Sequence, residues 1–130
     1  MAFETYEDYR KALEAADLPL NMGFFAASDS IKVALKGFGS KAYTAEELKT
    51  AQEYVKSASA QGAFGVTLGI MYQPECYSNR EELTAVVKAV AGNGGILCTH
   101  IRGEGDSLVE SVEEVIDVAA KAGVPLNISH

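Results

Sequence analysis

The sequence predicts an α/β protein in which parallel strands alternate with helices. Short apolar runs of strand length alternate with longer stretches whose apolar residues recur at helical spacing. The last three strand-like runs begin near residues 63, 95 and 124, which leaves room for a crossover helix between neighbours. An internal echo, Leu18-Pro-Leu-Asn-Met-Gly beside Val124-Pro-Leu-Asn-Ile-Ser, supports a repeated unit. About four such strands form either an open doubly wound sheet or part of an eight-stranded barrel, and the pattern alone does not choose between them.

Turn residues and helix caps set the boundaries expected in the first half of the chain. Pro19 ends the turn after the first helical stretch, and Gly37 closes the second. Thr44 and Glu47 have the spacing of a capping box, and Gly62 stops the helix that they open. The expected elements are, by residue number, a helix over 5–16, a strand over 20–26, a weaker helix over 30–36, a helix from 44 and a strand over 63–70.

The second half of the chain repeats the same pattern. Ser78 with Glu81 and Ser107 with Glu110 have capping-box spacing, so each pair predicts the start of a helix. Gly123 ends the last helix. The expected elements are a helix from 78, a strand over 96–101, a helix from 107 and a strand over 124–129.

Composition bounds the class of protein. The 130 residues are 48% hydrophobic and 22% charged, which is typical of one globular domain over residues 1–130. A net charge of -7 disfavours nucleic acid and anionic membrane as partners, and no apolar run is long enough to span a bilayer. The cysteines, Cys76 and Cys98, are too few for a disulfide framework, so we expect a cytoplasmic setting. Because His130 directly follows a strand-like run, we expect a fragment of a longer protein.

The two histidines of the chain stand at equivalent places. His100 and His130 each lie at the C-terminal end of an expected parallel strand, which is the end that carries the active site in α/β barrels. Neighbouring strands are about 4.8 Å apart, so two imidazoles at adjacent ends could reach one metal ion. The alternative is that each histidine is an ordinary polar residue of the core or surface.

Several side chains near these strand ends are further candidates. Cys98 lies two residues before His100 and shares its face, where it is either a zinc ligand or a small core residue. Arg102 and Glu104 fall on the same side if the strand continues, where the alternative is a structural ion pair. Tyr72 follows another strand end and could aim its hydroxyl into the same mouth, although packing is the alternative for a tyrosine near a proline.

Three stretches also match consecutive strand motifs of a known family. They are Gly62-Ala-Phe-Gly-Val-Thr-Leu-Gly-Ile-Met-Tyr-Gln-Pro, then Gly94-Gly-Ile-Leu-Cys-Thr-His-Ile-Arg-Gly-Glu-Gly-Asp, and finally Ala122-Gly-Val-Pro-Leu-Asn-Ile-Ser-His. The stretches resemble the fourth strand of the N-acyl-D-amino-acid deacylases, their fifth strand with its T-H-M-R-D-E motif, and their sixth strand, which ends I-S-H. The family belongs to the amidohydrolase superfamily. The resemblance is close from residue 62 to 130 and thinner over residues 3–41.

This resemblance implies a partial (β/α)8 barrel, from about the third to the sixth strand, with zinc as cofactor. His100 and His130 match the family's zinc-binding histidines of the fifth and sixth strands. Tyr72 matches a tyrosine that holds the substrate carboxylate or polarises the scissile carbonyl. Arg102 and Glu104 match the end of the fifth-strand motif and are expected to support substrate binding. The parent reaction is hydrolysis of the amide bond of a small N-acyl-D-amino acid.

The chain also departs from the family pattern. Gly103 stands where the motif has aspartate, and Ala27-Ser-Asp-Ser-Ile-Lys stands where a G-H-x-x-L-R-like segment is usual. The first-strand H-x-H, the upstream cysteine ligand, the lysine after I-S-H and the eighth-strand aspartate, which is the family's general base, have no counterpart within residues 1–130. We therefore expect this chain alone to be inactive as a deacylase.

Two other functions remain open at this level. One is another amidohydrolase with a cyclic amide or ureido substrate, and the other is a non-catalytic α/β assembly or binding module. A part-barrel of any function has two open strand edges and an uncovered inner face, which the sequence predicts to be apolar over residues 64–70 and 96–101. We therefore expect the chain to self-associate.

Overall fold

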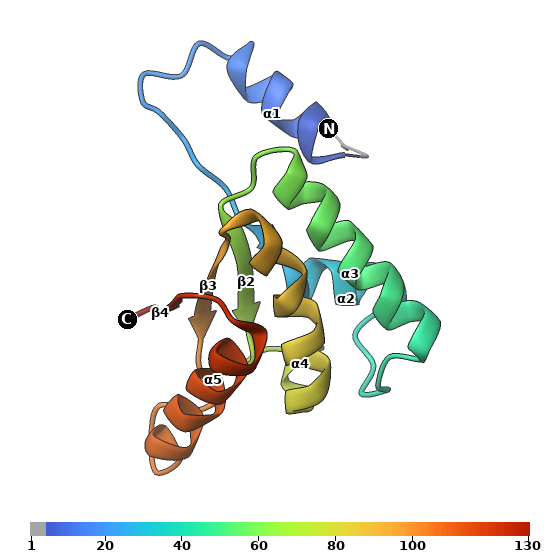
Figure 1. The fold of residues 1–130 in the computed structure, drawn as a ribbon, viewed down its shortest axis with the longest axis vertical. Coiled ribbons are helices and arrows are strands. Elements are labelled where there is room, and N and C mark those ends of the chain that lie inside the picture. The colour runs from blue at the N-terminus through green and yellow to red at the C-terminus, as the bar shows by residue number, and fades with distance from the viewer. Residues whose placement is uncertain (1–4) are drawn as a thin grey trace.

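A computed structural model describes residues 5–130 as one α/β layer (Figure 1). Helices and strands alternate in the expected order. The elements are α1 (Tyr6–Glu14), β1 (Ala26–Ala27), α2 (Ser28–Lys36), α3 (Ala45–Ala60), β2 (Gly65–Gly69), the 3-10 turn η1 (Glu75–Tyr77), α4 (Arg80–Val87), the 3-10 turn η2 (Lys88–Asn93), β3 (Ile96–His100), α5 (Leu108–Ala122) and β4 (Leu126–Ile128). Within the described range no helix is both long and apolar enough to cross a membrane.

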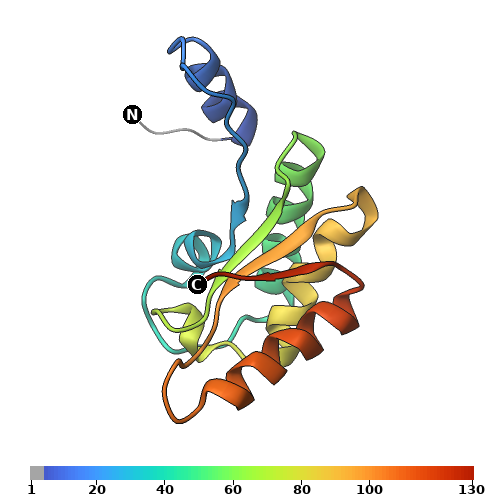
Figure 2. The ribbon, with the colours of Figure 1, turned by 90° about the vertical axis from the view of Figure 1, so that its left-hand side faces the viewer.

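The four strands form one parallel sheet in the order β1-β2-β3-β4. This is the order of the strands in the chain, so each strand lies next to its neighbour in the sequence. In Figure 2 the helices α3 and α4 lie behind the sheet, and α5 runs below it, next to α4. The expected fold class, parallel strands alternating with helices, is confirmed.

The two faces of the sheet differ in what covers them. Residues of β2 and β3 that point to the helices are buried, whereas their neighbours Thr67, Cys98 and His100 are only partly covered. The helix side forms the core, which includes Val66, Leu68, Leu97, Val55, Val86, Val87, Val115 and Val118. The open face is therefore mixed in character. The expectation of an apolar inner face holds for Ile96 and Cys98 but not for Thr67 and His100.

Close pairing of β2 with β3 depends on a glycine. A Cβ added at Gly65 would lie 1.9 Å from the carbonyl oxygen of Ile96. This distance is too short for any side chain at position 65. A second glycine, Gly123, ends α5. Its φ is 74°, a left-handed conformation that glycine adopts without strain.

Helix caps agree with the sequence at one place and differ at two. Thr44 and Glu47 form the expected reciprocal capping box of α3. The box of α4 is one residue later than expected and consists of Asn79 and Glu82, since the Ser78 hydroxyl instead accepts a bond from a buried lysine. Ser107 precedes α5 but makes no side-chain cap bond, so the expected third box is wrong.

The strand expected over residues 20–26 is wrong over most of its length. Only Ala26 and Ala27 pair with β2, preceded by a single bond from the Phe64 N–H to the Phe24 carbonyl. The reason is register. Because β2 begins at Gly65, the residues before Phe24 run past the end of the sheet and find no partner strand.

The position of the α4 cap can be tested by stability. Asn79→Ala removes the side-chain oxygen that accepts the Glu82 N–H, so we expect the free energy of unfolding to fall by about 1 kcal/mol. Glu81→Ala, at the exposed residue that the sequence placed in the cap, should change it by less than about 0.5 kcal/mol. Urea unfolding followed by circular dichroism measures both values. Equal effects would contradict the observed cap.

Candidate metal centre

Both histidines of the chain meet at the C-terminal edge of the sheet. His100 is the last residue of β3, and His130 follows β4. Their rings are 4.7 Å apart between centroids and nearly perpendicular. Two features of the backbone bring them together: the parallel pairing of Thr99 with Ile128, and the bond from the Ser129 N–H to the Thr99 carbonyl.

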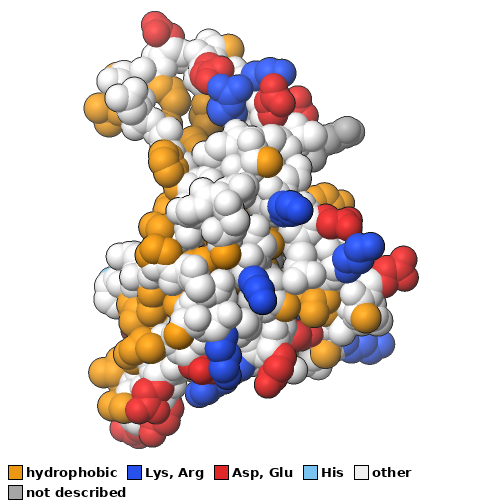
Figure 3. Space-filling view, in the orientation of Figure 1, with side chains coloured by type: hydrophobic (Ala, Val, Ile, Leu, Met, Phe, Trp, Pro, Cys, Tyr) orange, Lys and Arg blue, Asp and Glu red, His pale blue; other side chains and the backbone are white. Residues whose placement is uncertain are grey.

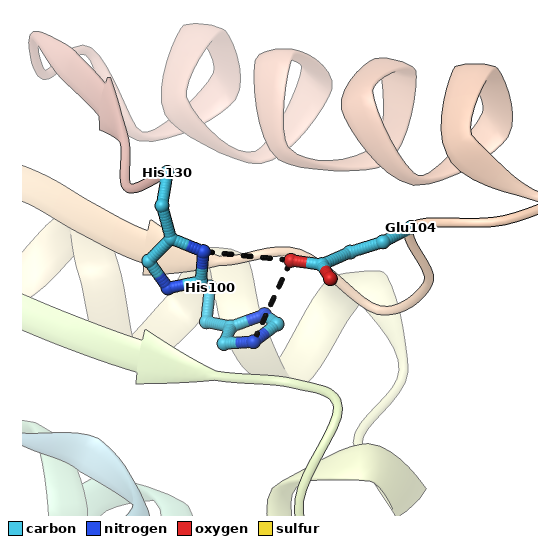
Figure 4. A group of neighbouring side chains, drawn as sticks. All are labelled: His100, Glu104 and His130. Atoms are coloured by element: carbon cyan, nitrogen blue, oxygen red, sulfur yellow. Dashed lines mark ion pairs between the residues drawn. The ribbon is translucent and has the colours of Figure 1, made fainter.

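A carboxylate lies beside both imidazoles. Glu104 reaches back from the loop after β3, with its Oε1 atom 3.8 Å from His100 Nε2 and 3.5 Å from His130 Nδ1 (Figure 4). One donor atom from each residue lies within 4.8 Å of the others. Two imidazole nitrogens and one carboxylate oxygen are a donor set that suits zinc, and three protein ligands are the usual number in its catalytic sites. These residues therefore fit a zinc ion.

A backbone carbonyl determines which ring nitrogen of His100 carries the proton in the neutral imidazole. Its Nδ1 atom lies 3.0 Å from the Ile101 carbonyl oxygen, which can only accept a hydrogen bond. Nδ1 therefore carries the proton, and in the neutral ring Nε2 keeps its lone pair. Metal-binding histidines are commonly oriented by a bond of this kind. The arrangement leaves the nitrogen that faces Glu104 free to bind a metal.

Tyr72 is brought to the same edge from the loop after β2. Its ring packs edge-on against His100, with 5.1 Å between centroids, and the residue is half-exposed. The structure thus places Tyr72, His100, His130 and Glu104 together. Their roles in binding metal or substrate stay predictions.

Arg102 is directed elsewhere. Its guanidinium donates to both carboxylate oxygens of Glu114, at 2.8 and 2.9 Å, and to the backbone carbonyls of Cys76 and Ser78. The hydrogen bond to Glu114 raises the pKa of Arg102. This side chain ties α5 to the segment around η1. Its predicted contact with substrate would require it to leave these partners. The alternative, a structural ion pair, is what the structure shows for Arg102, although the partner is Glu114 and not Glu104.

The cysteines stand apart from the histidines. Cys98 lies between Thr67 and Asn127 in the row of the sheet below His100, and it is not one of the donors grouped with the histidines. Cys76 lies in η1, and both thiols are free. Cys98 thus lies one layer below the histidines, as one alternative expected, but it is only partly covered and does not belong to the core.

Gly103 departs from the family motif, and its position shows what the departure changes. A Cβ added there would lie 2.2 Å from the Ser107 hydroxyl oxygen. An aspartate at position 103 would therefore require a shift of the Ser107 side chain, which lies directly before α5.

Four buried charged residues escaped the sequence analysis. Lys32, Glu75, Glu82 and Glu114 are almost fully buried, on α2, η1, α4 and α5. Lys32 Nζ donates to Ser78 Oγ and lies 3.7 Å from Glu82. Helical periodicity places Lys32 next to apolar neighbours but gives no signal for its partners, which come from 46 and 50 residues away along the chain.

No family model matches the chain. The chain is 31% identical over 128 residues to a D-aminoacylase of Alcaligenes xylosoxydans xylosoxydans, covering 98% of this chain and 26% of that protein. A D-aminoacylase crystal structure, described as defining a novel subset of amidohydrolases, superposes with a TM-score of 0.94 at 30% identity, over 98% of this chain and 27% of that one. An N-acyl-D-glutamate deacylase from Bordetella bronchiseptica, complexed with zinc and a phosphonate inhibitor, gives the same TM-score and coverage at 27% identity.

The four-stranded layer thus matches part of an amidohydrolase barrel. More narrowly, the chain is homologous to the D-aminoacylase and N-acyl-D-amino-acid deacylase family, as its three strand motifs predicted. It spans about a quarter of the length of the curated relatives that it matches.

The role of Arg102 in the fold can be measured against a matched arginine. Arg102→Ala leaves the mostly buried Glu114 carboxylate and two backbone carbonyls without their donor. The free energy of unfolding should therefore fall by about 2–3 kcal/mol. Arg80 pairs with Asp117 at 3.8 Å on the surface, and Arg80→Ala should cost less than about 1 kcal/mol. Urea denaturation of the two variants decides. A loss for Arg102→Ala no larger than that for Arg80→Ala would show that the buried contacts add nothing.

Proposed function

We propose that this chain is the metal-binding part of a zinc-dependent N-acyl-D-amino-acid deacylase, an amidohydrolase that cleaves the amide bond of N-acyl-D-amino acids. The observation that carries the proposal is the convergence of His100, His130 and Glu104 at one edge of the sheet. The homology to D-aminoacylases supports the reaction, and the zinc in the D-glutamate deacylase complex supports the metal.

In this proposal His100 binds the metal through Nε2, and His130 binds it from the neighbouring strand end. Glu104 supplies a carboxylate within reach of both and is the third donor of this chain. When bound, zinc lowers the pKa of its water to about 7 and polarises the amide carbonyl. Tyr72, packed on His100, offers a phenol to the substrate carboxylate or the scissile carbonyl oxygen.

A working deacylase also needs a group that moves the proton to the leaving amine. The aspartate that does so in the family has no counterpart within residues 1–130, nor do the first-strand histidines. The 130-residue chain on its own is therefore proposed to bind zinc without hydrolysing substrate.

Zinc binding tests this proposal. The purified chain should bind one zinc ion, and the His100→Ala/His130→Ala double variant should lose it, because two of three donors are gone. Glu104→Gln should weaken binding by about tenfold or more if the carboxylate is a ligand. Competition with a chromophoric chelator measures each affinity.

Two controls accompany the zinc measurement. Cys98→Ser should leave the affinity unchanged, which separates the histidine site from a thiol site, and unchanged binding in Glu104→Gln would return Glu104 to a substrate role. No zinc binding by the unaltered chain would favour the non-catalytic module. Turnover of an N-acyl-D-amino acid by the unaltered chain would contradict its proposed inactivity.

We also propose that the chain self-associates through its open strand edges. Neither β1 nor β4 has a second strand beside it in the described part of the chain. Hydrophobic side chains gather along the strand side of the molecule, at the left of Figure 3. Leu20 and Met22 precede β1 and Phe64 precedes β2, and they are exposed by 77%, 55% and 62%. Open edges beside such a surface favour pairing with another chain.

Sedimentation velocity tests self-association. We expect species larger than a monomer whose share grows with concentration. The Leu20→Ser/Met22→Ser variant should shift the distribution towards monomer, whereas Phe38→Ser, at a residue 67% exposed after α2, should not. A monomer at every concentration would contradict the proposal.

A further inference from the structure

The loop that carries Tyr72 is closed by a buried carboxylate. Glu75 lies in η1 and has no exposed surface. Its Oε2 atom accepts the backbone N–H of Gly69 at 2.5 Å. Gly69 is the last residue of β2 and pairs with His100 on β3. The carboxylate thus holds the end of the strand that adjoins the metal centre.

The backbone of Tyr72 is also hydrogen-bonded to Gly69. Its N–H donates to the Gly69 carbonyl at 2.9 Å, and its own carbonyl accepts the Cys76 N–H at 2.8 Å. A Cβ on Gly69 would lie only 3.4 Å from Tyr72 Cδ2, so the ring packs directly over the strand end. The contacts run in sequence from Glu75 to Gly69, then to Tyr72, and then to the ring of His100.

This placement is unfavourable for a carboxylate. Burial raises the pKa of Glu75, although hydrogen bonds from Ser28 and Gly69 and the charge of Lys32 act in the opposite direction. Its Oε1 atom has no hydrogen-bond partner among the described residues. A buried acceptor left unpaired destabilises a fold, so an exposed polar residue would close an ordinary turn at less cost. The buried carboxylate of Glu75 instead fixes the distance between η1 and the end of β2.

We propose that Glu75 is a positioning residue of the metal centre, which holds Tyr72 against His100 by binding the N–H of Gly69. Its relevance to catalysis rests on the proposed function. The placement of Tyr72 itself does not depend on metal and can be measured in the metal-free chain.

The test separates the reach of the side chain from its charge. Glu75→Gln keeps the length and an oxygen acceptor but removes the charge. Glu75→Asp keeps the charge but is one methylene too short to reach Gly69 without moving η1. Glu82→Asp is the matched control, since Glu82 is a buried glutamate that accepts the N–H groups of Tyr43 and Asn79 rather than that of the strand end.

The readout is the nuclear Overhauser effect between the Tyr72 ring and the His100 imidazole. With only two histidines in the chain, His130→Gln assigns the imidazole signals. We expect the effect to persist in Glu75→Gln and in Glu82→Asp, and to fall at least severalfold in Glu75→Asp. Urea midpoints measured on the same samples show whether Glu82→Asp is destabilised to a similar degree.

An unchanged Tyr72–His100 effect in folded Glu75→Asp would overturn the proposal, and so would its loss in Glu75→Gln or an equal fall in Glu82→Asp. If Glu75→Asp does not fold, Glu75→Met takes its place, because methionine keeps the length of the side chain but offers no oxygen to accept the Gly69 N–H. An unchanged Tyr72–His100 effect in folded Glu75→Met would overturn the proposal. Failure of the unaltered chain to bind zinc would count against the proposed function and leave this measurement unaffected.

Discussion

Parallel pairing of β2, β3 and β4 is the constraint on which the candidate site depends. Parallel strands end at the same edge of a sheet, so the residues that follow them share one small region. In-register pairing of Gly69 with His100, and of Thr99 with Ile128, brings the loop of Tyr72 and the two histidines together. A shift of one residue would turn His100 towards the helices and remove the cluster.

The same pairing divides the chain into a covered and an open face. Alternate residues of β2 and β3 pack against α3, α4 and α5, which supplies the apolar burial that stabilises the layer. The intervening residues, which include Thr67, Cys98 and His100, do not pack against these helices and are only partly covered. The candidate site and the apolar core thus lie on opposite faces of the same strands.

The sequence predicts the parts of this structure that repeat over many residues. Apolar periodicity and strand spacing were enough for the alternation of helices and strands, and the positions of His100 and His130 were enough to place both at strand ends. Local chemistry was less reliable, because Asn79 competes with Ser78 for the cap of α4 and Lys32 draws Ser78 away. The strand expected over residues 20–26 is too long, because the length of β1 depends on where its partner β2 begins.

Contacts between distant segments could not be read in this way. Glu104 reaches the histidines only because the loop after β3 folds back, and Glu75 meets Gly69 only because η1 packs beneath the strand end. Buried charge is concentrated at this edge. Lys32 and Arg102 both bind Ser78, and Arg102 draws Glu114 of α5 to the same segment. An apolar core alone would hold the strands at lower cost, but it is non-directional, and hydrogen-bonded charges hold a loop in one geometry. The polar contacts therefore determine where Tyr72 stands, and the apolar layer determines that the sheet exists.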